Sequence, residues 1–131
     1  MAMTVYTEPY LYNSLLSDME ISIVDKICYQ FNQYGGRDWE CLATGLAYNM
    51  PNPMRDKVRL IQGEVDRCDR LCHTLHEKLH ILLNTFVLRC RMYGAEIDLI
   101  DHLLEVLNSE RVFHTPYRIL VESIINLRMM G

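Results

Sequence analysis

The sequence predicts an all-α fold, and two patterns carry this prediction. Apolar residues recur at intervals of three and four along nearly the whole chain, which is the spacing of one helix face. The strict alternation that a half-buried strand needs is hard to find over five or more residues. With 131 residues, half of them hydrophobic, the chain can build one core but is short for two domains. We expect a single domain over residues 1–131, a six-helix antiparallel bundle in which residues 1–16 form an N-terminal extension.

Capping signals and an apolar stripe predict the first two helices. Ser17 and Glu20 match the S-x-x-E capping box, which satisfies free backbone N–H groups at a helix start, so a helix is expected over residues 19–33. The glycine pair that follows has the backbone freedom to end it. Asp38 is a good N-cap for the second, shorter helix. The inward face of that helix consists of Trp39, Leu42, Ala43 and Leu46.

Proline and glycine positions delimit the two middle helices. Asn52 followed by Pro53 is a cap-then-proline start, which predicts a helix over residues 53–62. Gly63 interrupts this segment, and a long amphipathic helix is expected over residues 65–92. Its single apolar stripe consists of Leu71, Leu75, Leu79, Leu82 and Phe86.

Two further helices are expected in the C-terminal part. Glu96 and Asp98 supply the acidic first turn that the helix dipole favours, in a helix that runs to about residue 108. Thr115 and Pro116 repeat the cap-plus-proline start and open the last helix. Its stripe consists of Ile119, Leu120, Ile124 and Leu127.

Charge and cysteine usage limit the classes of function. The formal net charge of -4 argues against a nucleic-acid binder, because such proteins need clustered Lys and Arg to displace counterions. No secretory signal pattern is visible, and the apolar runs are far shorter than the roughly 20 residues of a membrane span. Five scattered cysteines, an odd number, do not form a disulfide framework. We therefore expect a cytoplasmic protein with protein partners, no nucleic acid and no membrane insertion.

One cluster of Cys and His residues resembles a metal site. Cys68, Cys72, His76 and His80 fall at four-residue intervals, and zinc prefers these residue types. On one straight helix the first and last would lie about 18 Å apart, whereas zinc holds its ligands at about 2 Å. We therefore predict no metal and no other cofactor, although a zinc-binding regulator that completes Cys72 and His76 with another segment stays open. Nucleotide-binding glycine motifs and a nucleophile-bearing turn are absent from the sequence, so no enzyme and no catalytic residue are predicted.

Several segments resemble one known family. The D-W-x-x-L-A-x-x-L pattern runs unbroken from Asp38 to Leu46. Together with the preceding segments 11–15 and 23–27, it resembles the first two helices of death domains, in which an apolar first helix precedes this pattern. Residues 97–107, with Arg111 and the apolar residues 119–121, look like the fifth and sixth helices of the same family. The family usually has a tryptophan in its fourth helix, where this sequence has a phenylalanine. The resemblance implies a bundle of the death-fold type and a signalling adaptor that assembles with other death-domain proteins by homotypic contact, in innate-immune, NF-κB-type or apoptotic signalling.

The arrangement of charges selects candidate partner-binding residues. Residues 96–110 contain five acids and no Lys or Arg, whereas residues 55–59 and 89–91 carry basic groups. Death-fold partners often pair acidic with basic patches, and the resemblance implies the same use here. Such rim charges set partner choice and association rate, although each one can also be an ordinary solvated residue. The candidate contacts are Arg37, Asp38 and Glu40 in the second helix, Arg55, Asp56, Lys57 and Arg59 in the third, and Asp98, Asp101 and Glu105 in the fifth.

A helical bundle unrelated to the death fold is the alternative. It would use the long helix expected over residues 65–92 for coiled-coil-like dimerisation, because an apolar stripe on a long helix can also pair with a second copy. Loss of residues from 65 onward should unfold a death fold, whereas dimerisation in light scattering would favour this alternative.

Overall fold

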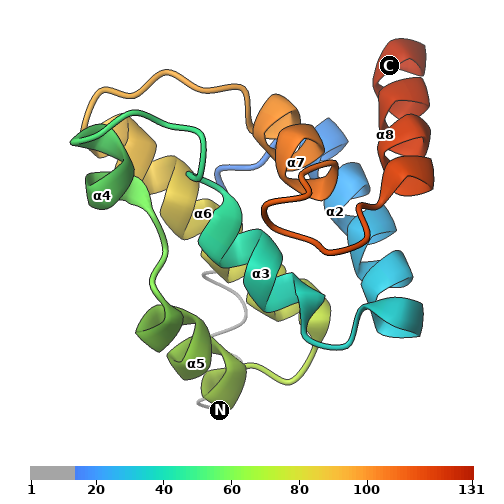
Figure 1. Cartoon of the computed structure of the whole chain (residues 1–131), viewed down its shortest axis with the longest axis horizontal. Coiled ribbons are helices and arrows are strands. Elements are labelled where there is room, and N and C mark those ends of the chain that lie inside the picture. The colour runs from blue at the N-terminus through green and yellow to red at the C-terminus, as the bar shows by residue number, and fades with distance from the viewer. Residues whose placement is uncertain (1–13) are drawn as a thin grey trace.

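A computed structural model describes residues 14–131 and consists of helices and connecting loops (Figure 1). Six of its helices have eight or more residues, α4 and η1 are short, and no strand occurs in this part of the chain. The predicted all-α bundle is confirmed. The expected N-terminal extension lies, up to residue 13, outside the described residues. The elements are α2 (Asp18–Gln30), η1 (Phe31–Gly35), α3 (Asp38–Gly45), α4 (Met54–Val58), α5 (Gln62–Leu71), α6 (Leu75–Met92), α7 (Leu99–Leu107) and α8 (Arg118–Met130).

The predicted capping box begins α2. The Ser17 hydroxyl accepts a hydrogen bond from the Glu20 backbone N–H at 3.1 Å, and the Glu20 carboxylate accepts one from the Ser17 N–H at 2.7 Å. The helix continues into the π-helical turn η1, which ends at Gly36. The φ angle of Gly36 is +53°, a left-handed conformation that favours glycine, so the predicted stop is confirmed.

The middle of the chain differs from the expected two helices. Within residues 53–61 the only helix is the single-turn α4, and the chain leaves it in an extended conformation at Arg59. Gly63 lies inside the first turn of α5 instead of ending a helix. The break comes later, where Cys72 is extended and the Thr74 hydroxyl caps α6 by accepting from the Glu77 N–H at 3.1 Å. The prediction of one helix over residues 65–92 is therefore wrong.

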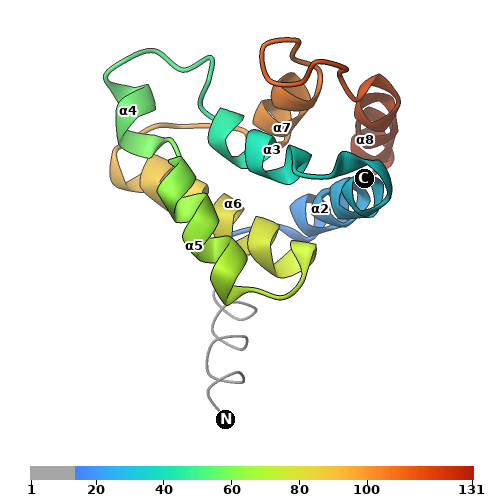
Figure 2. The ribbon, with the colours of Figure 1, turned by 60° about the horizontal axis from the view of Figure 1, so that its bottom comes forward.

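Helix α3 occupies the centre of the bundle. It packs against η1, α5, α6 and α7, and both ribbon views show it between these elements (Figures 1 and 2). The predicted inward face is confirmed, because Trp39 is 7 % exposed and the remaining three side chains are at most 1 % exposed. These side chains belong to one core that extends over all the longer helices.

The apolar stripe predicted for the long helix is divided by the break. Leu79, Leu82 and Phe86 are buried in α6 and face the core. Leu71, at the end of α5, is instead 66 % exposed. The extended residues between α5 and α6 change the direction of the chain, so the two halves of the stripe no longer share one face.

Truncation of the largest fully buried side chain should destabilise the protein. Phe86→Ala should lower the free energy of unfolding by about 3–5 kcal/mol, because Phe86 has no exposed surface and its loss leaves a cavity. The matched control is Ile119→Ala, at a side chain that is 84 % exposed, and should change it by no more than about 0.5 kcal/mol. Urea denaturation followed by circular dichroism measures both values, and equal effects would contradict the assigned core.

Candidate functional site

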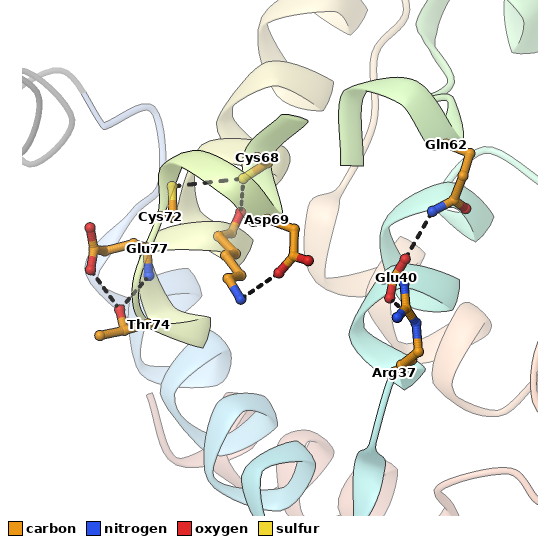
Figure 3. Close-up of polar contacts among 9 residues, drawn as sticks. Arg37, Glu40, Gln62, Cys68, Asp69, Cys72, Thr74 and Glu77 are labelled. Carbon is orange, nitrogen blue, oxygen red and sulfur yellow. Dashed lines mark hydrogen bonds and ion pairs between the residues drawn. The ribbon is translucent and has the colours of Figure 1, made fainter. Parts of the chain in front are cut away.

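The charged residues at the start of α3 are largely engaged within the chain. Arg37 Nε lies 2.6 Å from a carboxylate oxygen of Glu40, and Gln62 of α5 donates to the other oxygen at 2.8 Å (Figure 3). The Glu40 carboxylate is buried, with 9 % of its side chain exposed, so both partners compensate its desolvation. Glu40, predicted as a partner contact, therefore holds α3 to α5. Arg37 has 78 % of its side chain exposed and lies at the surface.

Asp38 has a partner that the sequence analysis missed. The Tyr117 hydroxyl, just before α8, donates a hydrogen bond to the Asp38 carboxylate. Burial and this carboxylate raise the pKa of Tyr117, which keeps the hydroxyl protonated as a donor. Asp38 is half-buried, and its carboxylate connects the first turn of α3 to the start of α8.

Among the predicted partner contacts, the residues on and after α4 have the loosest contacts within the chain. Arg55 is half-buried and donates to the Tyr48 carbonyl at 3.3 Å. Asp56 and Arg59 are exposed and form a loose i,i+3 pair at 3.7 Å. Lys57 is exposed, with its ammonium 5.5 Å from the centre of the Tyr93 ring. Exposed pairs of this kind contribute little to stability, so these charges stay available to a partner. We define the α4 surface as Asp56, Lys57 and Arg59.

The acidic strip on α7 is partly neutralised by α8. Asp98 caps α7 by accepting from the Ile100 N–H at 3.0 Å, and the Arg128 guanidinium pairs with both Asp98 and Asp101. Glu105 accepts a hydrogen bond from the Asn49 side chain in the loop after α3. All three predicted acids are exposed, but each has a partner inside the chain. Arg128 was missed because it lies 27 residues or more along the chain from its partners.

Arg89, predicted as part of a basic surface group, is also engaged internally. Its guanidinium pairs with the Glu64 carboxylate of α5 and donates to the Arg59 carbonyl at 3.0 Å. The hydrogen bond from Arg89 is the main cause that lowers the pKa of Glu64. This half-buried pair holds α5 and the preceding linker against the C-terminal half of α6.

The Cys and His cluster is not assembled around one point. Cys68 and Cys72 contact one another, with 3.9 Å between their sulfur atoms. The His76 ring instead reaches Asp25 of α2 at 2.9 Å, and burial lowers the pKa of His80. Among residues 14–131, no group of three or more His, Cys, Asp or Glu side chains could hold a metal ion. Cys72 and His76, the pair left open for zinc, thus have different partners.

The chain was compared with known proteins in three ways. Protein-family models, curated proteins and solved structures were all compared with the chain, and none matched. None of the helices in residues 14–131 combines the length and the apolar composition needed to cross a membrane.

The ion pair between Glu64 of α5 and Arg89 of α6 predicts that the stability of the fold depends on pH. The pKa of Glu64 lies below its ordinary value of 4.5 in the folded protein, so the pair stabilises the fold above that value and this contribution is lost as the pH falls through the lowered pKa. Glu64→Gln should therefore lower the free energy of unfolding at pH 7 by about 1 kcal/mol or less, because the pair is half-buried. The difference from the wild type should shrink towards zero between about pH 5 and pH 2. Urea denaturation at several pH values measures it, and a difference that grows on acidification would contradict the assignment.

Proposed function

We propose that this chain is a death-fold interaction module, a signalling adaptor that assembles with other death-domain proteins by homotypic contact. The expected setting is innate-immune, NF-κB-type or apoptotic signalling. One observation carries the proposal: the apolar positions of the D-W-x-x-L-A-x-x-L pattern form the buried face of α3 inside a six-helix bundle. The pattern therefore contributes to the core, as its apolar spacing predicts, and this burial supports the proposal and leaves the surface for partners.

The α4 surface is the contact that we propose. Lys57 and Arg59 are exposed, and their loose contacts within the chain can be exchanged for those of a partner at little cost. α4 and α8 lie at opposite ends of the bundle in both ribbon views (Figures 1 and 2). The basic residues of the α4 surface thus lie far from α8, which carries Arg128 (Figures 1 and 2). Arg128 already neutralises two acids of α7. An acidic patch on another death domain suits this surface.

A cytoplasmic location belongs to the same proposal. All five cysteines are thiols, and one of them, Cys41, is exposed. Exposed thiols persist in compartments kept reduced by glutathione, whereas secreted domains of this size commonly pair their cysteines.

The coiled-coil alternative loses its main support. It needs a long helix with an apolar stripe that faces outwards, as a dimer seam does. The segment is broken before Thr74, and the stripe of α6 faces the core of its own chain. We therefore propose no second function.

Charge reversal on α4 tests the proposal. The tagged full chain is expressed in its native cells, and bound proteins are cross-linked, purified and identified by mass spectrometry. Lys57→Glu/Arg59→Glu should reduce recovery of a death-domain partner about tenfold or more, since facing like charges cost several kcal/mol. Helical circular dichroism should stay unchanged, because both side chains are exposed.

The matched control is Arg67→Glu/Arg70→Glu, which reverses two exposed arginines on α5 and changes the net charge equally. This variant should bind like the wild type. Absence of any death-domain protein from the wild-type sample would overturn the proposed function. Equal losses in both variants would show that net charge, and not the α4 surface, controls binding.

A further inference from the structure

Two cysteine sulfurs lie close together at the end of α5. Cys68 is in its last turns and Cys72 is its C-cap, and their Sγ atoms are 3.9 Å apart (Figure 3). A disulfide holds its sulfurs at about 2.05 Å, so the two atoms need to approach by about 2 Å. Cys72 has φ -113° and ψ 147°, outside the helix, and is the first of the three linker residues before α6. Because Cys72 lies outside the helix, the proposed closure needs a movement of this linker and not an unwinding of α5.

A surface groove is lined by both cysteines and is a route of access for small molecules. It lies between α5 and α6, has a volume of about 340 Å³, and is lined by Cys68 and Cys72 together with Leu60, Arg67 and Leu82. The cysteines are only 6 % and 9 % exposed, which keeps large molecules away. Hydrogen peroxide is little larger than water, whose share of the liquid is about 30 Å³, so it fits the groove.

The environments of the two thiols give them different roles. The Cys68 thiol can donate to the Lys78 carbonyl, at 3.6 Å, as well as to Cys72. Burial raises the pKa of Cys68 to about 12, and the neighbouring Cys72 adds to this rise. Burial also raises the pKa of Cys72, but the hydrogen bond from Cys68 opposes the rise. The thiolate therefore forms more readily at Cys72, which is also the more exposed of the two.

We propose that Cys68 and Cys72 are a modification site at which a hydroperoxide converts the two thiols into a reversible intramolecular disulfide. The Cys72 thiolate attacks one peroxide oxygen and breaks the O–O bond, which leaves a sulfenic acid on Cys72 and releases an alcohol or water after protonation. The Cys68 sulfur then attacks the Cys72 sulfur, the S–O bond breaks, and the departing hydroxide takes the Cys68 proton as water. The two thiols lose two electrons and two protons, and the peroxide gains them.

The other cysteines serve as internal references. Cys28 and Cys90 are buried, and Cys41 is exposed. Across residues 14–131, Cys68 and Cys72 are the pair of cysteine sulfurs in contact. A peroxide that reaches other thiols should therefore leave them as single oxidised residues, whereas this pair closes on itself.

Peptide mapping tests the proposal directly. The full chain carries Cys41→Ser to prevent bonds between molecules, is treated with hydrogen peroxide, and has its remaining thiols alkylated before trypsin digestion. Trypsin cuts after Arg70, between the two cysteines, so a disulfide joins peptides 68–70 and 71–78, which otherwise separate. We expect this joined peptide, its loss on reduction, and faster formation from pH 7 to pH 9 as the thiolate fraction rises.

Single substitutions assign the roles of the two cysteines. Cys72→Ser should abolish both the joined peptide and oxidation at this site. Cys68→Ser should instead accumulate a sulfenic acid on Cys72, which dimedone traps. Peroxide treatment that oxidises Cys72 in the Cys41→Ser chain but yields no joined peptide would overturn the proposal, as would alkylation of both thiols after treatment. Peptide mapping of the Cys41→Ser chain tests the proposal even if Cys68→Ser or Cys72→Ser fails to fold.

Discussion

The burial of one face of α3 is the constraint on which the remaining structure depends. Trp39, Leu42 and Leu46 form this buried face, and α3 contacts α5, α6, α7 and η1, so each of these elements is positioned relative to α3. A tryptophan side chain alone buries 150–250 Å² in the usual range, which makes it a strong anchor for a helix of eight residues. The same placement draws Glu40 inwards, where its charge needs Arg37 and Gln62 as partners.

This packing also determines which charges remain for recognition. Acids that look like a continuous strip in the sequence are brought against α8, where Arg128 pairs with two of them. Arg89 is drawn into the contact between α5 and α6. The α4 surface escapes these contacts because α4 is a single turn at one end of the bundle (Figure 1). The proposed partner contact thus follows from the three-dimensional arrangement more than from charge counts along the chain.

The fold class could be predicted from local sequence signals. Contacts between segments far apart in the sequence could not. The capping box at Ser17 and the stripe of α3 are confirmed, since both depend on residues within a few positions. The break before α6 was misplaced because Gly63 was read as the interruption and the Thr74 cap was missed, although glycine is tolerated in a first helical turn. The Arg128 contacts could not be predicted without knowing that α7 and α8 are neighbours. The cysteine spacing was visible, but the extended backbone at Cys72, which creates the proposed modification site, was not.

The buried position of the single tryptophan is the central claim, and its fluorescence tests it most directly. Trp39 is 7 % exposed, and the Lys78 ammonium lies 5.1 Å from its ring centre. The native emission should be blue-shifted relative to the unfolded chain and resist quenching by acrylamide. In a urea titration it should shift to the red in the same transition that removes the helical circular dichroism. Native emission at the wavelength of the unfolded chain, with full quenching, would contradict the central position of α3.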